Sequence, residues 1–325
     1  MSNTATTLPP RSTFLVVLES GLALLWMFLA FAGNLTVFVA ISKNKQLRTV
    51  PNFLLLNLAI ADIFSTVITL PALASVLVKG SWTFHPLVCQ FQAFQAYTSY
   101  CCNLLTLAVS SISRYYATAH PIKYRITFQV HRICLMIAII WIASLLIASV
   151  PVLGWGRYRF EPLYALCVHE TNFSPSFDVF LFFLLMLNAT VIVACYSRIF
   201  RAVKKRHRSV NFLLATRSCS RQLELMNRQE TRQTNTIFIV ICLFAVCYLP
   251  TIVIGFVVFT PVQVPRFARM FSTFSVSFTS VVNPIVYWMR TKSFRDALKG
   301  LFGRRAATVQ QSSQQGGAQR NVSVV

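Results

Sequence analysis

The side chains that could do chemistry in this sequence are polar residues set inside long apolar stretches. Asp62, in LNLAIAD, is the only acid deep inside such a stretch, and a carboxylate there must be protonated or balanced by a cation. Amide and hydroxyl groups at comparable depth in other stretches could share that charge: Asn34, Asn103, Thr279 and Asn283. This set predicts a site for water or a small monovalent cation such as sodium. A purely structural hydrogen-bond cluster stays open as the alternative.

Two further charges stand where apolar stretches end. Arg114, in SRYYATAHPIKY, follows Asn103 by eleven residues, about three helical turns, so the two share one helix face. Glu230 precedes Pro250 by twenty residues and is expected at the same end of another helix. An Arg114/Glu230 ion pair would latch the two helices and release when one moves. Two solvated charges, which contribute little to stability, remain the alternative.

Pro250 in CYLP and Pro284 in NPIVY both interrupt apolar stretches. Proline removes a backbone donor and frees a carbonyl in the preceding turn. In hydrocarbon this is tolerated where side chains or water replace the lost hydrogen bond. We expect Asn283, Thr279 and Ser280 to do so near Pro284, and we expect both helices to act as hinges.

The sequence carries no pattern of a catalytic or metal centre. It has no Ser/His pairing or paired carboxylates inside the apolar stretches, and no CxxC or His/Cys cluster. Catalysis would need such a nucleophile, base or ligand set. We therefore expect that the protein is not an enzyme.

The elements that carry these residues are the apolar stretches themselves. Of 325 residues, 55% are hydrophobic and 12% charged, and the mean hydropathy is +0.60, which excludes an ordinary soluble domain. A helix needs about 20 apolar residues to cross roughly 30 Å of hydrocarbon. Seven stretches meet that length: 14–41, 51–78, 87–117, 133–153, 177–200, 236–259 and 267–289. We expect an all-α membrane protein, a seven-transmembrane helix bundle.

The remaining segments are short. Residues 1–13 are expected to form a short extracellular N-terminus, and 14–290 the seven-helix domain. Residues 291–303 place apolar side chains at helical spacing with basic ones between, which predicts an amphipathic helix on the inner leaflet. Residues 304–325 are rich in Gln, Ser and Gly and are expected to be a disordered cytoplasmic tail.

The distribution of positive charge predicts the orientation. The formal net charge is +22, and alternate assignment of the loops puts 24 of the 30 Lys and Arg residues on the side that holds the C-terminus. Loops rich in Lys and Arg face the cytoplasm, so the N-terminus is expected outside. A basic inner face beside anionic membrane lipid accounts for the charge, and no nucleic-acid partner is expected.

Three smaller signals lie outside the helices. Of nine cysteines, only Cys89 and Cys167 map to the outer face, where disulfides persist, so these two are expected to be bonded. Asn172 begins an Asn-Phe-Ser glycosylation triplet, although Pro175 follows it directly. The chain ends at Val325 in a pattern that PDZ domains bind. A chance ending remains the alternative.

Together these residues resemble the rhodopsin-like class of G-protein-coupled receptors. The motifs that carry the resemblance occur in chain order: Gly33-Asn34, LxxAD ending at Asp62, Cys89, SRY at 113–115, Trp141, Tyr196, CYLP at 247–250 and NPIVY at 283–287. The resemblance implies a plasma-membrane receptor that binds a heterotrimeric G protein and arrestin. It also implies the residues of an activation switch: Arg114, Tyr115, Tyr196, Glu230, Asn283, Pro284 and Tyr287. The class usually has an acid where this chain has Ser113, so we expect raised basal activity.

Within that class the sequence looks most like the opsins. GWGRYRFEPLYALC, residues 154–167, resembles their second outer loop, with Glu161 at the position of its carboxylate. Glu161 is expected to meet Arg157 or Arg159. Opsins bind retinal as a Schiff base on a lysine, and Ser277 stands at that position in this chain. A serine hydroxyl forms no stable imine, so no covalent retinal is expected.

Helical phase predicts a mostly neutral outer cavity, which suits a small neutral or lipid-like ligand. An amine is not expected, because Ala96 stands where amine receptors present an aspartate. The expected lining is Gln92, Ala96, Tyr100, Glu161, Tyr248, Thr251 and Ser277. A peptide or melatonin-like receptor of the same class stays open, as does an ion- or proton-coupled transporter that uses Asp62.

Overall fold

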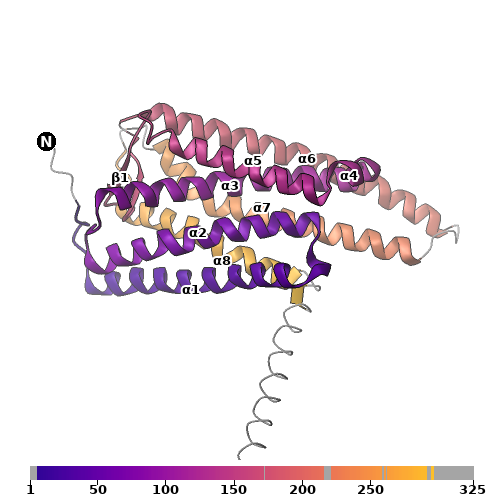
Figure 1. The fold of residues 1–325 in the computed structure, drawn as a ribbon, viewed down its shortest axis with the longest axis horizontal. Coiled ribbons are helices and arrows are strands. Elements are labelled where there is room, and N and C mark those ends of the chain that lie inside the picture. The colour runs from indigo at the N-terminus through magenta and orange to yellow at the C-terminus, as the bar shows by residue number, and fades with distance from the viewer. Residues whose placement is uncertain are drawn as a thin grey trace, which may run out of the picture.

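The computed structural model describes residues 6–171, 173–215, 221–257, 260, 262–290 and 294–295, with only the backbone described for 205–215 and 221–233. Figure 1 shows the elements in these ranges. The helices are α1 (Thr13–Lys43), α2 (Val50–Lys79), α3 (Pro86–Ala119), α4 (Pro121–Thr127), α5 (Val130–Ser149), α6 (Pro175–Ala215), α7 (Arg221–Val257) and α8 (Arg266–Arg290), with a 3-10 turn η1 (Lys45–Leu47). The strands are β1 (Tyr158–Glu161) and β2 (Leu166–His169).

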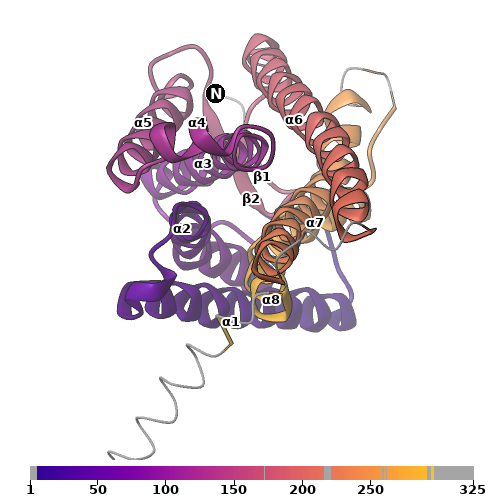
Figure 2. The same cartoon turned by 90° about the vertical axis from the view of Figure 1, so that its right-hand side faces the viewer.

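Among the described residues, seven long helices run side by side, and α4 is a short helix at one end of the bundle (Figures 1 and 2). Each predicted stretch has its core in one of these seven, and α3 lies in the middle, in contact with α2, α5, α6 and α7. α1, α2, α5, α6 and α7 are apolar and long enough to cross a membrane. α3 and α8 are more polar because they bury amides and hydroxyls inside the bundle.

The helix predicted over 133–153 ends earlier than expected. α5 stops at Ser149, and the chain turns through Pro151 to Gly154, whose φ is +107°. Val150 still has helical dihedrals, with φ −52° and ψ −47°. The helix ends because Pro151 has no N–H to donate to the carbonyl four residues before it, and Gly154 adopts positive φ without strain. Apolarity alone therefore overestimated this helix by one turn.

The N-terminal segment closes one end of the bundle. The backbone N–H of Leu8 donates to the Gly80 carbonyl at 2.8 Å, and that of Trp82 donates to the Thr6 carbonyl at 2.8 Å. Leu8 and Trp82 are buried in the same hydrophobic cluster. Residues 6–8 are thus anchored over the loop that joins α2 to α3.

The two strands form an antiparallel hairpin over the same end of the bundle. Phe160 pairs with Cys167, and Cys167 forms the predicted disulfide with Cys89 at the start of α3, with Cα atoms 5.5 Å apart. The Cys167 N–H also donates to Gln92 Oε1 at 3.0 Å. The disulfide prediction is confirmed, and it fixes the hairpin against α3.

The charges of the hairpin pair differently from the prediction. Arg157 and Arg159 both contact Glu170, the latter at 3.1 Å, and neither meets Glu161. Partial burial raises the pKa of Glu170, but its hydrogen bonds with the two arginines and their charges outweigh that effect and hold the pKa below its ordinary value. Glu161 instead accepts from the Leu163 N–H at 3.3 Å, because it begins the turn between the strands.

The predicted amphipathic helix 291–303 lies outside the described residues, apart from Phe294 and Arg295. Phe294 is buried in the hydrophobic cluster of the bundle. Arg295 donates to the carbonyls of Trp288 at 3.1 Å and Met289 at 2.6 Å. A guanidinium at these orphan carbonyls stabilises the C-terminal end of α8.

Candidate ligand cavity and polar core

A polar core joins three helices around the Asp62 carboxylate on α2. Asn103 on α3 donates to Oδ1 at 3.1 Å, while Ser280 and Asn283 on α8 donate at 3.0 and 2.9 Å. Asp62 is 1% exposed. The structure therefore brings together three of the residues that the sequence grouped by membrane depth, and each hydrogen bond disperses charge that would otherwise be costly to bury.

Thr279 does not join this cluster as expected. Its hydroxyl donates to the Val276 carbonyl at 2.7 Å, and the next residue, Ser280, contacts Asp62. A shift of one position turns a side chain by about 100° around a helix, which separates the two hydroxyls.

Asn34 on α1 satisfies the carbonyl that Pro284 frees. A regular helix would pair the residue-284 N–H with the Ser280 carbonyl, four residues before it. Asn34 Nδ2 donates to that carbonyl at 2.8 Å and to the Ala30 carbonyl at 2.9 Å. The expectation that Asn283, Thr279 or Ser280 would do this was wrong, because the donor comes from a neighbouring helix.

Gly33 gives α1 the close approach that this bond needs. A Cβ atom at Gly33 would lie 2.9 Å from both Cβ and Cγ of Pro284. Gly33→Ala should therefore lower the free energy of unfolding by about 1–3 kcal/mol, since the helices must separate to admit it.

Gly21, on the same helix, supplies the matched control, because a Cβ there meets nothing within 4 Å. Gly21→Ala should stabilise by roughly 0.5–1 kcal/mol through helix propensity. Thermal unfolding of the detergent-solubilised proteins separates the two. Equal stabilisation by both substitutions would show that α1 and α8 are not in close contact at Pro284.

A cavity of about 570 Å³ extends from the polar core to the hairpin. Asp62, Asn103 and Ser280 lie along its inner end, and Tyr164 and Leu166 of the hairpin region along its outer end. Five residues predicted for the pocket line it: Ala96, Tyr100, Tyr248, Thr251 and Ser277. The polar core and the cavity are thus parts of one space.

Gln92 and Glu161, also predicted for the pocket, do not line it. Gln92 is buried against the hairpin backbone and accepts from Cys167, as described above. Glu161 faces its own turn. Ser277 lines the cavity, and its hydroxyl donates to the Thr273 carbonyl at 2.8 Å.

A His/Asp pair in the outer wall was missed at the sequence level. His169 at the end of β2 and Asp178 in the first turns of α6 both line the cavity, with His169 Nδ1 3.2 Å from each carboxylate oxygen. The signal available was the position of His169 two residues after Cys167, which the disulfide fixes above the bundle. The outer lining was predicted to be mostly neutral, and the structure adds the carboxylate of Asp178 to it.

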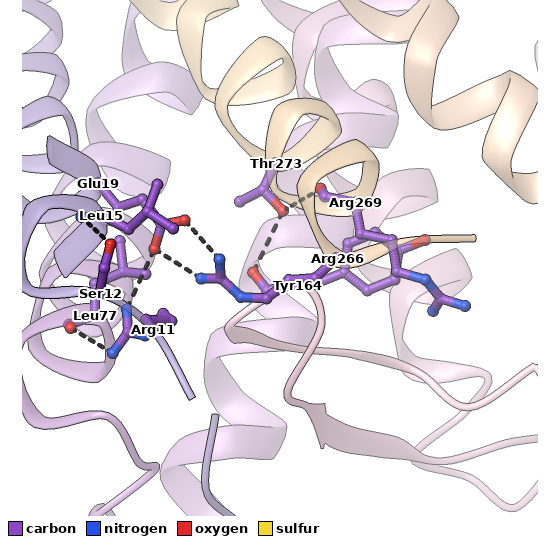
Figure 3. A network of polar contacts seen from close by, with 9 residues as sticks. All are labelled: Arg11, Ser12, Leu15, Glu19, Leu77, Tyr164, Arg266, Arg269 and Thr273. Atoms are coloured by element: carbon purple, nitrogen blue, oxygen red, sulfur yellow. Dashed lines mark hydrogen bonds and ion pairs between the residues drawn. The ribbon is translucent and has the colours of Figure 1, made fainter. Parts of the chain in front are cut away.

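A network of arginines holds the outer ends of the helices together (Figure 3). Glu19 on α1 accepts two hydrogen bonds of 2.7 Å from Arg266 at the start of α8 and one of 3.2 Å from Arg11. Arg11 also donates to the Leu77 carbonyl of α2 at 2.9 Å. These contacts tie the N-terminal segment, α1, α2 and α8 into one rim.

The rim continues to the hairpin turn over the cavity (Figure 3). The Arg269 guanidinium lies 5.2 Å from the centre of the Tyr164 ring, and Thr273 Oγ1 donates to the Tyr164 carbonyl at 3.3 Å. Tyr164 and Thr273 line the cavity. A bound molecule that displaces Tyr164 would therefore change the contacts of Tyr164 with Thr273 and Arg269 on α8.

Comparison with known proteins identifies this architecture. The family model for the 7 transmembrane receptor (rhodopsin family) matches residues 33–287. The chain belongs to the rhodopsin family of seven-transmembrane receptors. It is therefore a multi-pass membrane receptor and not an enzyme, and its seven long helices are the transmembrane helices of that family.

Several relatives of this receptor are known by sequence and structure. It is 25% identical to the melatonin receptor type 1A of Phodopus sungorus over 89% of this chain and 81% of that protein. It is 29% identical to the rhodopsin of Scyliorhinus canicula over 86% of this chain and 79% of that one. The crystal structure of squid rhodopsin superimposes with a TM-score of 0.82 at 20% identity, covering 92% of this chain and 91% of that one, which supports the fold.

The end of the receptor that carries α4 holds three of the predicted switch residues, Arg114, Tyr115 and Tyr196. Arg114 is 3% exposed near the end of α3, and the Tyr115 hydroxyl lies 3.1 Å from His120 Nε2. The Tyr196 hydroxyl on α6 donates to the Thr234 carbonyl on α7 at 3.5 Å. α3, α6 and α7 therefore meet at this end of the bundle.

Three predictions from the sequence stay predictions. The side chain of Glu230 lies outside the described residues, so the Arg114/Glu230 latch is not tested. Tyr287 of NPIVY is buried, and its hydroxyl has no hydrogen-bond partner in the described part of the chain. The glycosylation site at Asn172 and the PDZ-binding end at Val325 also lie outside the described residues.

Proposed function

We propose that this chain is a plasma-membrane receptor in which a small ligand in the cavity activates a heterotrimeric G protein. The observation that carries the proposal is the continuity of the cavity with the polar core: one space is lined by hairpin residues at one end and by Asp62, Asn103 and Ser280 at the other. A ligand can therefore change the contacts between α2, α3 and α8 without any separate relay. The N-terminus lies outside the cell and the C-terminus in the cytoplasm.

An aromatic stack provides the route to α7. The Tyr100 and Tyr248 rings are 5.1 Å apart in the cavity wall, and the Tyr248 and Phe244 rings are stacked at 4.3 Å. Pro250 lies two residues after Tyr248 and weakens α7 there. A ligand that displaces Tyr248 shifts the equilibrium of α7 about this point, since it binds the two positions with different affinity.

The polar core also fits a monovalent cation such as sodium. Asp62 supplies carboxylate oxygens, and the Oδ1 atom of Asn103 is buried without a hydrogen-bond partner in the described part of the chain. Oxygen ligands of this kind suit hard cations. Such an ion would be held by Asp62 and Asn103 and would balance the carboxylate charge while the core is closed.

The ligand that the cavity favours is small and largely apolar, and it is held without a covalent bond. Ser277 offers no amine for a Schiff base. Melatonin receptors are among the relatives at 25% identity, so a melatonin-like ligand is the second candidate. The transporter alternative has no support, because the chain belongs to a receptor family.

Arg114→Ala should reduce GTP exchange to the level of empty membranes while leaving surface abundance within about twofold of wild type. Arg114 is buried at the G-protein end, and the family resemblance makes it a residue of the coupling switch. The class usually has an acid at the position of Ser113, so we expect measurable exchange by the unliganded receptor.

Nucleotide exchange on purified heterotrimers, normalised to surface antibody labelling, measures this effect. Arg48→Ala is the matched control, because Arg48 lies at the same end of the bundle and contacts only the Ser42 carbonyl in the hydrogen bonds described. If Arg114→Ala catalyses GTP exchange at the wild-type rate, Arg114 is not part of the G-protein coupling site.

A further inference from the structure

The outer end of the cavity presents a carboxylate that the protein leaves mostly unsatisfied. Asp62 accepts three hydrogen bonds from its own helices, whereas Asp178 has His169 Nδ1 as its hydrogen-bond partner among the described residues. The Asp178 side chain is 24% exposed and lines the cavity. A carboxylate can accept about four hydrogen bonds, so Asp178 can accept further hydrogen bonds from a molecule in the cavity.

His169 orients this carboxylate. The imidazole is fully buried, and its other nitrogen, Nε2, has no partner in the described part of the chain. That nitrogen faces Gly156, where a Cβ would come within 2.7 Å. A proton on Nε2 would be a buried donor without an acceptor, which is costly. A proton on Nδ1 has an acceptor, because Nδ1 lies 3.2 Å from both carboxylate oxygens of Asp178.

The described lining carries no permanently positive side chain. The residues that line the cavity include two carboxylates, Asp62 and Asp178, and no lysine or arginine. Arg269 stacks on Tyr164 but is not part of the lining. Phe182 lies four residues after Asp178, on the same face of α6, and its ring packs edge-on against Phe256 at 4.9 Å. An aromatic and acidic wall of this kind favours a cation.

We propose that the cavity binds a small amphipathic amine, with its ammonium group on Asp178 and its apolar body toward Tyr248. The absence of an acid at position 96 excluded only an amine held from α3, whereas Asp178 offers a counter-ion from α6. This inference rests on the cavity being a ligand site, and it names the chemical class of the ligand. His169 is a positioning residue that acts through Asp178.

Matched pairs of probes test the charge directly. Phenethylamine, tryptamine and dodecylamine are each compared with their N-acetyl counterparts, which keep the apolar body and lose the charge. The readout is the melting temperature of the purified full-length receptor in detergent, titrated to half-saturation. At least one amine should reach half-saturation at a concentration tenfold or more below its acetamide, as a charge-assisted hydrogen bond implies.

Asp178→Asn should abolish that preference, and Glu161→Gln should retain it. Glu161 is the matched control because it is an acid of the same outer region that does not line the cavity. His169→Gln, which keeps an N–H donor, should retain more of the preference than His169→Leu.

Three results would each overturn the proposal: equal binding of amine and acetamide in every pair, no binding of any amine, or an unchanged preference in Asp178→Asn. Because this readout is binding, it fails separately from the proposed function, which GTP exchange tests without any probe.

Discussion

Asp62→Ala is expected to lower the free energy of unfolding by about 2–5 kcal/mol and to abolish GTP exchange. The substitution leaves the donors of Asn103, Ser280 and Asn283 facing a space without an acceptor. Each buried donor without a partner costs roughly 1–3 kcal/mol, although water entering from the cavity offsets part of that. Thermal unfolding in detergent and exchange on purified heterotrimers measure the two effects.

Asp62→Asn is the matched control, because the amide has nearly the same size and keeps one acceptor oxygen, while it removes the charge and replaces the other oxygen with an NH2 donor. It should cost less stability than alanine. The exchanged pair Asp62→Asn/Asn283→Asp returns a carboxylate and an amide to the two ends of the 2.9 Å hydrogen bond, so it should recover part of the loss seen in each single variant. If Asp62→Ala has the melting temperature and the GTP exchange of wild type, the hydrogen bonds of Asp62 neither stabilise the receptor nor take part in its activation.

The second large effect is expected from the disulfide. Joint replacement Cys89→Ser/Cys167→Ser should lower the melting temperature by roughly 10 °C, because the bond closes a segment of 78 residues, for which chain entropy gives about 4 kcal/mol. The hairpin would also lose its attachment to α3, so the amine preference at the cavity should fall with it.

Cys134→Ser is the control for this pair, since Cys134 is an exposed, unbonded cysteine on α5. It should melt within about 2 °C of wild type. Addition of a reducing agent to wild type should reproduce the double variant and leave that variant unchanged. Equal melting temperatures of wild type and the double variant would show that the hairpin is held by its packing alone.

Membrane physics made much of the fold predictable. The length and apolarity of the seven stretches indicated helices. In lipid a single segment can pair all of its backbone N–H and C=O groups internally only as a helix. The cost of burying Asp62, Asn103 and Asn283 indicated that they meet, and the structure brings them together. Asn34 was expected in the same group, but its partner is a backbone carbonyl, which side-chain patterns do not reveal.

The outer wall of the cavity was less predictable, because it depends on a hairpin that has little periodicity. The turn between β1 and β2 directs Glu161 to its own backbone, and the strand register brings Arg157 and Arg159 to Glu170. The same register places His169 over Asp178. The His169/Asp178 contact joins β2 to α6, and nothing in the spacing of either segment specifies their relative position.

The most direct test of the account is GTP exchange on a panel of purified heterotrimers by membranes that contain the receptor. The account predicts exchange above that of empty membranes with at least one heterotrimer, and its loss in Arg114→Ala and Asp62→Ala at matched surface abundance. Exchange equal to that of empty membranes with every heterotrimer, both without ligand and with amines shown to bind, would contradict the proposal that this receptor couples its cavity to a G protein.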